Sequence, residues 1–331
     1  MARLRVLFIG GTGVISSACV RSALVAGHEV AVINRGTTSH RPVPSDVETL
    51  HADVRDDDAV ETAISGRRFD VVADFMSFVP DHVEAHVARW RGHVGQYVFI
   101  SSASAYQTPP ARVPVVESTP LHNPFWEYSR QKAACEDILV NAYRHDGFPA
   151  TIVRPSHTYD RTLVPFDGGW TVMERIKRGA PIVIHGDGTS LWTLTHHRDF
   201  ASAFVGLLGD SRAHGEAFHI TSDEVLTWDQ IAGLLANAAG VEPRIVHVPS
   251  DAIAAIDPEW GASLLGDKAH SMIFDNTKIK RMVPGWQAEI PFWRGAAEIV
   301  EWHEADPARR ETNPAVDAAI DRIIDRYGSP A

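Results

Sequence analysis

The stretch "RVLFIGGTGVISS" (residues 5–17) decides the fold of this chain. It begins with an almost continuous apolar run, as expected of a strand covered on both faces, and then changes to the spacing of a helix. Gly10, Gly11 and Gly13 lie at the change. Glycines at such a turn let backbone N–H groups approach a pyrophosphate, which the N-terminus of the following helix stabilises. The stretch therefore predicts the first βα turn of a dinucleotide-binding unit, with a plain tight turn as the alternative.

Strand and helix patterns alternate after this turn, and the regularity weakens beyond residue 160. We expect an α/β fold with a doubly wound parallel sheet of the Rossmann type and a smaller mixed α/β substrate lobe. The dinucleotide-binding domain would span residues 1–160, with later sheet strands returning from about 190–225, and residues 161–331 would form mainly the substrate lobe and the C-terminal tail. The expected strands are 5–9, 29–34, 47–54, 69–76, 95–102 and 150–155, and the expected helices include 15–28, 126–143 and 227–240.

Composition narrows the class of protein. Of the 331 residues, 44% are hydrophobic and 22% are charged, which is typical of a globular protein. The formal net charge of −11 repels phosphate backbones, so we expect no nucleic-acid partner. No apolar run approaches the ~20 residues that span a bilayer, and the N-terminal segment has no signal-peptide cleavage site. We expect a cytoplasmic protein that forms a homodimer, with Cys19 and Cys135 as reduced packing residues.

The end of the second expected strand points to the cofactor. Proteins that bind NAD usually carry Asp or Glu there, which accepts a hydrogen bond from the ribose 2′-hydroxyl. This chain has Asn34 and Arg35 instead. A neutral Asn does not repel a 2′-phosphate, and an arginine can donate to it in bidentate fashion, so we favour NADP over NAD. A solvated Arg35 is the alternative. Asp53, after the third strand, is expected either to accept from the adenine amino group or to cap the next helix.

Tyr128 and Lys132 are four residues apart in an expected helix, so their side chains share one face. A tyrosine is a poor base near neutrality because its ordinary pKa is about 10. A neighbouring ammonium would stabilise the phenolate and lower that pKa. Ser101, Ser102 and Ser104 end the fifth strand, at the carboxyl edge where open parallel sheets bind ligands. These residues predict proton transfer at that edge.

With these motifs in this order, followed by "VRPSHTY" (153–159), the chain resembles the extended short-chain dehydrogenase/reductases, the NAD-dependent epimerase/dehydratase group. The resemblance continues through "HGDGTS" (185–190) and "FDNTKIKRMVPGW" (274–286), so it covers nearly the whole chain. It implies that Tyr128 is the general acid/base and that Lys132 lowers its pKa and holds the nicotinamide ribose.

The resemblance also implies that Ser102 orients the reacting hydroxyl or carbonyl, that Pro155 and Ser156 border the nicotinamide, and that His157 faces the substrate. A histidine hydrogen-bonded behind the sheet edge is the alternative for His157. The residues expected at the cofactor are Gly10, Thr12, Gly13, Val14, Ile15, Asn34, Arg35, Asp53, Val54, Ser101, Tyr128, Lys132, Pro155 and Ser156. Those expected at the substrate are Met76, Ser104, His157 and Trp192.

Two departures from the family pattern concern the reaction and the pocket. Sugar dehydratases of the group carry an Asp-Glu pair where this chain has Ala103 and Ser104, so we do not expect 4,6-dehydration. At the end of the fourth strand, Met76 and Phe78 replace the usual small residues and are expected to narrow the pocket.

A third departure concerns the substrate. Nucleotide-sugar members carry a diphosphate-binding Arg where this chain has Trp192, and a second one before a later G-D, where "SLLGDK" (263–268) offers none. Without both, the charged forks that hold a pyrophosphate are missing. Four basic residues could replace them, but we expect each to be a solvated surface charge: Arg161, Lys177, Arg178 and Lys268.

The motifs favour an NAD(P)-dependent epimerase or reductase that acts on a sugar or sugar-like small molecule. The alternatives are an RNA-binding protein or a dinucleotide sensor on the same fold, against which stand the net charge and the intact Tyr128 and Lys132. We expect no metal site. His196 and His197 are adjacent, and neighbouring strand residues point to opposite faces, so their imidazoles should not converge on one ion.

Overall fold

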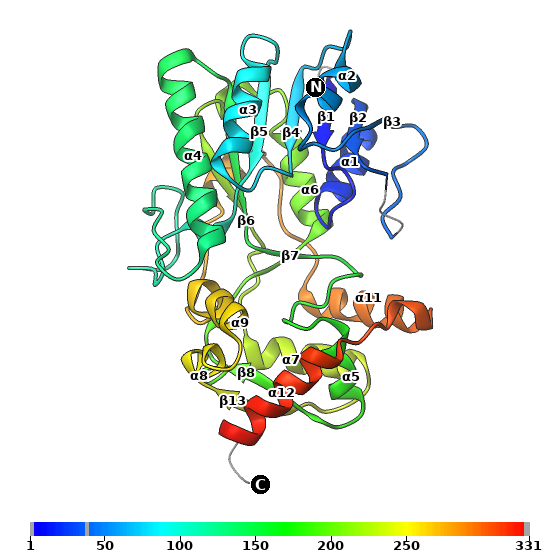
Figure 1. Cartoon of the computed structure of the whole chain (residues 1–331), viewed down its shortest axis with the longest axis vertical. Coiled ribbons are helices and arrows are strands. Elements are labelled where there is room, and N and C mark those ends of the chain that lie inside the picture. The colour runs from blue at the N-terminus through cyan, green and yellow to red at the C-terminus, as the bar shows by residue number, and fades with distance from the viewer. Residues whose placement is uncertain (1–2, 37–39, 328–331) are drawn as a thin grey trace.

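A seven-stranded parallel sheet forms the centre of the computed structural model, which describes residues 3–36 and 40–327 (Figure 1). Its strand order is β11-β6-β5-β4-β1-β2-β3, and every neighbouring pair is parallel. This is the predicted doubly wound arrangement, because the chain winds outward from β1 in both directions. The strands are β1 (Arg5–Ile9), β2 (Glu29–Asn34), β3 (Glu48–His51), β4 (Val71–Asp74), β5 (Gln96–Ile100), β6 (Ala150–Pro155) and β11 (Ala217–Ile220).

Helices cover both faces of this sheet. Along β1, Val6 and Phe8 pack into the core beneath α1 (Ser16–Val25) and α6 (His197–Gly206). Leu7 and Ile9 point the other way, into the core beneath α2 (Asp57–Ile64), α3 (Pro80–Trp90) and α4 (Glu127–Asp146). Both sets are almost fully buried. The continuous apolar run of the first strand therefore exists because neither of its faces meets water.

The second half of the chain builds a smaller mixed lobe below the sheet in Figure 1. Its own core lies between β8 (Pro181–His185), which pairs in parallel with β13 (Arg244–Val248), and surrounding helices. Those helices are α5 (Trp170–Lys177), α7 (Trp228–Ala238), α8 (Ser250–Ala254), α9 (Pro258–Ser263), α11 (Phe292–Glu304) and α12 (Pro314–Tyr327). The amphipathic stretch in the tail forms α12, whose Ile320 and Ile323 join this core.

Short strands connect the lobes. Of the stretch from 190 to 225, only β11 returns to the central sheet. The others make two-stranded sheets: β10 (Leu194–His196) pairs with β7 (His157–Tyr159), and β9 (Leu191–Trp192) pairs with β12 (Leu226–Thr227). After β6 the chain therefore passes from the edge of the central sheet into the lower lobe. The residues that follow β6 can line a cavity between the sheet and this lobe.

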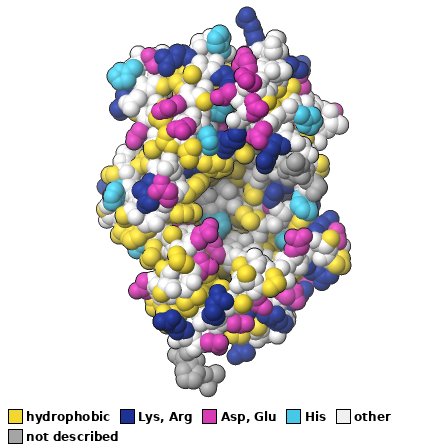
Figure 2. Space-filling view, in the orientation of Figure 1, with side chains coloured by type: hydrophobic (Ala, Val, Ile, Leu, Met, Phe, Trp, Pro, Cys, Tyr) yellow, Lys and Arg dark blue, Asp and Glu magenta, His cyan; other side chains and the backbone are white. Residues whose placement is uncertain are grey.

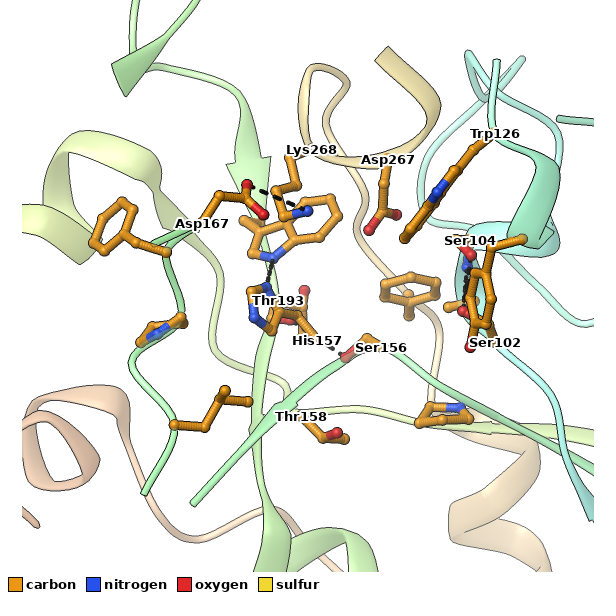
Figure 3. A pocket seen from close by; sticks show the side chains of 18 of the residues that line it. Ser102, Ser104, Trp126, Ser156, His157, Thr158, Asp167, Thr193, Asp267 and Lys268 are labelled. Carbon is orange, nitrogen blue, oxygen red and sulfur yellow. Dashed lines mark hydrogen bonds and ion pairs between the residues drawn. The ribbon is translucent and has the colours of Figure 1, made fainter. Parts of the chain in front are cut away.

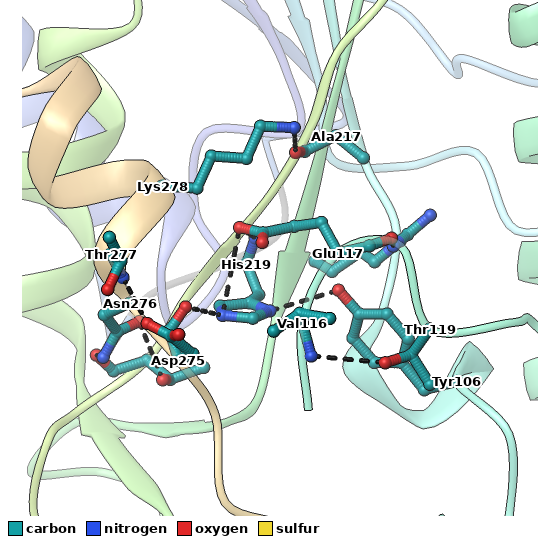
Figure 4. A network of polar contacts seen from close by, with 12 residues as sticks. Tyr106, Val116, Glu117, Thr119, Ala217, His219, Asp275, Asn276, Thr277 and Lys278 are labelled. Atoms are coloured by element: carbon teal, nitrogen blue, oxygen red, sulfur yellow. Dashed lines mark hydrogen bonds and ion pairs between the residues drawn. The ribbon is translucent and has the colours of Figure 1, made fainter. Parts of the chain in front are cut away.

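A buried polar network anchors β11 to the segment that precedes α10 (Thr277–Met282) (Figure 4). His219 Nε2 donates to the carbonyl of Asp275 at 2.8 Å, so its Nδ1 accepts from the Tyr106 hydroxyl at 3.1 Å. Asn276 donates to the carbonyl of Thr221 at 2.9 Å. These groups are buried, so any arrangement that broke one of the hydrogen bonds would leave a buried polar group unpaired at a cost in free energy. The network therefore holds β11 and the 275–277 segment in one arrangement.

A second buried network joins three segments at the carboxyl edge of the sheet. Glu136, on α4, accepts hydrogen bonds from Arg154 at the end of β6, with the closest pair at 2.5 Å. The same carboxylate accepts from the hydroxyl of Ser101, which follows β5, at 2.5 Å. Arg154 also donates to the carbonyl of Glu117 at 3.0 Å. All of the charged atoms are nearly inaccessible to water, so this ion pair fixes α4 relative to the ends of β5 and β6.

Candidate active site

A continuous hollow runs along the carboxyl ends of the central strands and into the lower lobe. Figure 2 shows this face hollowed between the two lobes, with Lys and Arg side chains gathered above the hollow and Asp and Glu below. Its outer groove lies over the ends of β1, β2 and β3 and includes Asn34, Arg35, Asp53 and Arg55. The middle groove lies between the glycine turn and α4, and the inner cavity lies beyond Tyr128. Adjacent sections share lining residues, so they form one path.

All fourteen residues expected at the cofactor line the outer or middle groove. The outer groove contains Gly10, Thr12, Gly13, Asn34, Arg35, Asp53 and Val54. The middle groove contains Gly10, Thr12, Gly13, Val14, Ile15, Ser101, Tyr128, Lys132, Pro155 and Ser156. Ser102, expected to be catalytic, lines the middle groove and the inner cavity, where the two meet.

The glycine turn has room only for glycine. Gly10 has φ +82°, and a Cβ added there would lie 2.4 Å from Cγ of Met76. A Cβ on Gly11 would lie 2.6 Å from a methyl group of Val32 on the next strand. Helix α1 then begins without a side-chain cap, so its first N–H groups are not engaged by a capping side chain. A glycine-rich turn that leads to an uncapped helix N-terminus fits the pyrophosphate of a dinucleotide.

The end of β2 separates two roles. Asn34 holds the turn, because its side-chain oxygen accepts from the N–H of Gly36 at 2.8 Å. Arg35 is exposed at the outer groove and has no hydrogen bond or ion pair with another residue in the described part of the chain. Asp53 accepts from the N–H of Arg55 at 3.0 Å, while Asp56 is the residue that caps α2. Helix capping by Asp53, one of its two expected roles, is therefore wrong.

Lys132 is buried between two backbone carbonyls. Its ammonium donates to Ser77 and to Ile100, each at 2.7 Å. The turn that presents Ser77 is itself shaped by the buried carboxylate of Asp74, which accepts from the N–H groups of Met76 and Ser77. Burial lowers the pKa of Lys132 to about 8, although the charge of Asp74 acts in the opposite direction. The ammonium thus remains the main form at neutral pH.

The structure corrects the expected effect of Lys132 on Tyr128. Burial raises the pKa of Tyr128 to about 12, and the hydrogen-bonding effect of Ser102, which lowers it, is smaller. Asp267 also raises this pKa through its negative charge. The ammonium of Lys132 lies 5.9 Å from the centre of the phenol ring and donates to carbonyls, so the expected lowering is absent. Tyr128 is a protonated acid at neutral pH.

A chain of hydroxyl groups extends from Ser102 into the protein. The hydroxyl oxygens of Ser102 and Ser104 are 2.8 Å apart, and that of Ser129 donates to Ser104 at 2.8 Å. Ala103 and Ser104 lie in a buried turn of 3₁₀ helix immediately after Ser102. Since no carboxylate stands at these two positions, this turn supplies hydroxyl groups beside Tyr128 and no acid–base pair.

The inner cavity has a volume of about 410 Å³, and its lining mixes aromatic rings with hydroxyl groups, aliphatic side chains and three charged residues. Trp192 is almost fully buried, and its indole N–H donates to Nδ1 of His157 at 3.1 Å. Because an indole can only donate, Nδ1 of His157 is an acceptor and its proton lies on Nε2. Burial lowers the pKa of His157 to about 3, so the imidazole is neutral. Trp192, His157 and Ser104, three of the residues predicted to contact the substrate, all line this cavity, and His157 is at the same time hydrogen-bonded to Trp192.

Three charged residues at the cavity were missed as site residues by the sequence analysis. Asp267 and Lys268 come from a turn of π-helix (Leu264–Lys268). Lys268 lies beside Asp167, and Asp267 lies beside Trp126 (Figure 3). Lys268, expected to be solvated, is buried, with its ammonium 3.9 Å from the carboxylate of Asp167. One feature of the sequence could have pointed to Asp267 and Lys268 as site residues. They stand in "SLLGDK" (263–268), next to the positions where related nucleotide-sugar enzymes carry an arginine. None of the described residues that line the inner cavity is an arginine.

Met76 lies elsewhere than expected. It lines the outer and middle grooves but not the inner cavity, because its side chain fills the space left by the missing Cβ of Gly10. Phe78 likewise lines the middle groove, 4.7 Å from the ammonium of Lys132. These two residues shape the path beside the glycine turn and do not narrow the substrate cavity.

His196 and His197 do not lie on one strand with their side chains on opposite faces, as the sequence analysis expected. His196 ends β10 and caps α6, which begins at His197, so strand alternation stops between them and their rings meet edge to face at 4.5 Å. His196 is buried and its Nε2 donates to Glu298 at 3.2 Å. Among residues 3–36 and 40–327, no three His, Cys, Asp or Glu side chains form a group that could hold a metal ion. Within those ranges no helix is long and apolar enough to cross a membrane.

Comparison with known proteins gives one family. Residues 6–221 match the model of the NAD dependent epimerase/dehydratase family. The chain is 30% identical to the 2′-dehydrokanamycin reductase of Streptomyces kanamyceticus, over 86% of this chain and 80% of that protein. It is 28% identical to the chloroplast stem-loop binding protein of 41 kDa b of Arabidopsis thaliana, over 97% and 84%. It is 29% identical to the UDP-glucose 4-epimerase of Lactobacillus helveticus, over 92% and 98%.

Solved structures share the fold. The UDP-glucose 4-epimerase of Thermotoga maritima, solved with UDP-glucose, superposes with a TM-score of 0.74 at 20% identity, covering 91% of this chain and 99% of that one. An epimerase from Methanothermobacter thermautotrophicus gives a TM-score of 0.76 at 16% identity, covering 93% and 94%.

Replacing Gly10 with alanine should abolish tight dinucleotide binding. The new Cβ would displace Met76 and require an L-residue at φ +82°, so we expect the Kd for NADPH, measured by fluorescence titration, to rise roughly tenfold or more. Gly27→Ala is the matched control, since Gly27 has φ +86° but nothing within 4 Å of its Cβ position. Equal Kd values for Gly10→Ala and the wild type would show that the ligand does not lie over this turn.

Proposed function

The chain belongs to the NAD-dependent epimerase/dehydratase family, and from this premise we propose that it is a reductase that transfers a hydride from NADPH to the carbonyl carbon of a sugar-like substrate. The observation that carries the proposal is the position of Tyr128, which lines both the middle groove and the inner cavity where the two meet. Burial raises the pKa of its phenol to about 12, so the phenol keeps its proton at neutral pH. Such a phenol can give its proton to a developing alkoxide, whereas the phenolate that oxidation would need is scarcely populated, which favours reduction over oxidation.

The fit of the path to a dinucleotide supports this role. The glycine turn and the N-terminus of α1 would hold the pyrophosphate, and Lys132, Pro155 and Ser156 line the stretch nearest to Tyr128. A bound dinucleotide would supply the hydride. The chain itself must hold the substrate carbonyl, exclude water and supply the proton.

The proton would come from the hydroxyl of Tyr128. Ser102 and Tyr128 would both donate hydrogen bonds to the carbonyl oxygen, and the proton of Tyr128 would move to that oxygen as it gains negative charge. Ser129 donates to Ser104, which pairs with Ser102, so the hydroxyl chain can orient Ser102 for donation. Lys132, which donates to two backbone carbonyls beside the Tyr128 ring, would hold the groove around the tyrosine.

Epimerisation is the second candidate, and the relatives named UDP-glucose 4-epimerase favour it. It would use the same tyrosine with a retained dinucleotide. The inner cavity argues for reduction of another kind of substrate, because the described lining offers no arginine for a diphosphate and carries two carboxylates. Dehydration is disfavoured for a further reason, since Ala103 and Ser104 supply no carboxyl group, although one relative is named dTDP-glucose 4,6-dehydratase.

We propose a small-molecule substrate and no nucleic-acid partner. The similarity to the chloroplast stem-loop binding protein raises the alternative of RNA binding. The net charge of −11 and the carboxylates of the cavity oppose it, because RNA binding depends on neutralising phosphates with basic residues. A gel-shift assay with stem-loop RNA at low and high salt would reveal a salt-sensitive complex if the alternative held.

Replacing Tyr128 with phenylalanine should remove most of the activity. We expect the rate of NADPH oxidation with a panel of keto sugars to fall by about 10²–10⁴-fold, because the proton donor is lost while the ring is retained. Tyr143→Phe is the matched control: Tyr143 is on the same helix, α4, but is exposed. The proposed mechanism is wrong if both variants reduce the substrate as fast as the wild type.

Replacing Arg35 with alanine should change the choice of cofactor. Its guanidinium is free of partners among the described residues and faces the outer groove, so it is available to a 2′-phosphate. We expect kcat/KM for NADPH to fall roughly tenfold or more, since a charge-assisted bond is lost, and kcat/KM for NADH to change little. Arg68→Ala, an exposed arginine outside the groove, controls for net charge. A wild type that prefers NADH would refute the preference for NADP.

A further inference from the structure

The inner cavity contains one carboxylate that the protein does not neutralise. Among its described lining residues, Asp167 and Asp267 are acidic and Lys268 is basic. The ammonium of Lys268 lies 3.9 Å from Asp167 and 3.5 Å from the hydroxyl of Ser263, so it is already engaged. The carboxylate of Asp267 accepts no hydrogen bond from any residue in the described ranges. A negative charge therefore faces the cavity without a hydrogen bond or an ion pair among the described residues, although the charge of Lys268 partly offsets it.

The position of Asp267 is fixed by the turn that carries it. In the π-helical turn, the N–H of Ala269 donates to the carbonyl of Leu264 at 2.8 Å. Asn123 donates to the carbonyl of Gly266 at 2.6 Å, and a Cβ on Gly266 would lie 2.6 Å from that of Trp126. The turn thus packs closely against the segment that begins α4. Asp267 projects from it into the cavity beside Trp126 (Figure 3).

The ionised form of the Asp267 carboxyl group is unfavourable in this cavity until a cation binds beside it. Burial raises the pKa of Asp267 to about 6, and the nearby Asp167 adds to the increase while Lys268 reduces it. A cation bound beside the carboxylate would relieve this cost. The ring of Trp126 is already a cation site, because the ammonium of Lys268 lies 5.8 Å from its centre, and a ligand ammonium would share this electron-rich environment. A diphosphate would instead bring two further negative charges toward Asp167 and Asp267.

We propose that the inner cavity binds a substrate that carries a protonated amine, such as an amino sugar or an aminocyclitol, and that Asp267 receives the ammonium beside Trp126. The inference rests on the proposed function, because it places the reacting carbon of the same molecule at Tyr128. Tyr128 and Asp267 both line this one cavity of about 410 Å³, so they can bind different parts of one small molecule. Asp267 is a specificity-determining residue, and Lys268 limits the cavity to a single unpaired negative charge.

The test is equilibrium binding to the full chain saturated with NADP⁺, measured by isothermal titration calorimetry. The probes are glucosamine, kanamycin as a compound with several amines, the N-acetylated form of each, glucose and UDP-glucose. We expect the free amines to bind roughly tenfold or more tightly than their N-acetylated forms, since one charge-assisted hydrogen bond is at stake. UDP-glucose should bind more weakly than either amine.

Three variants sharpen the test. Asp267→Asn should weaken binding of the amines roughly tenfold or more while leaving the binding of glucose unchanged. Lys268→Gln should strengthen binding of the amines, because it removes a competing cation, and this gain cannot come from misfolding. Asp251→Asn, which removes an equal charge on α8 outside the cavity, should behave as the wild type.

The inference is overturned if neither amine binds, if acetylation has no effect, if Asp267→Asn binds the amines as the wild type does, or if UDP-glucose binds most tightly. Hydride transfer is measured separately from binding. Reduction of a neutral keto sugar without amine binding would overturn the amine site alone. Amine binding that depends on Asp267, in a protein that never oxidises NADPH, would overturn the proposed function alone.

Discussion

The buried ion pair of Glu136 and Arg154 is the interaction on which the candidate site depends. Glu136 lies one turn beyond Lys132 on α4, Arg154 directly precedes Pro155 at the end of β6, and the same carboxylate accepts from Ser101 after β5. Breaking such a pair typically costs about 3–5 kcal/mol, because an unpaired charge stays buried. A displaced arrangement of these three segments is therefore unfavourable. The pair aligns the acid, the serine and the wall of the groove before any ligand arrives.

Burial then acts in opposite directions on the two titratable groups that this frame supports. It raises the pKa of Tyr128 to about 12 and lowers that of Lys132 to about 8, since the low-dielectric interior disfavours both charged forms. At neutral pH the phenol keeps its proton and the ammonium keeps most of its charge. That combination suits a site that gives a proton to a developing alkoxide. The carboxylate of Asp267 reinforces it, because it further disfavours a phenolate in the unliganded site.

Sequence reasoning predicted the parts of the site that depend on local pattern. The glycine turn, the doubly wound parallel sheet and the position of the fourteen proposed cofactor residues along the outer and middle grooves follow from short motifs at the ends of consecutive strands. What depends on distant packing could not be predicted in this way. Asp267 lies at the cavity because its π-helical turn packs on Trp126. Met76 lies at the groove because its side chain packs in the space where a Cβ of Gly10 would be. The pKa of Tyr128 depends on the same long-range burial, so the sequence alone suggested the wrong direction.

The pH dependence of the single-turnover rate of NADPH oxidation tests the central claim, that Tyr128 acts as a protonated acid, most directly. With the keto substrate that turns over fastest, the rate should be level through neutrality and fall above about pH 8, where Lys132 loses the charge with which it binds the carbonyls of Ser77 and Ile100 beside the groove. The phenol itself should not titrate in this range. A rate that instead rises through a pKa near neutrality, and loses that rise in Tyr128→Phe, would show that Tyr128 works as a phenolate base and would contradict the account.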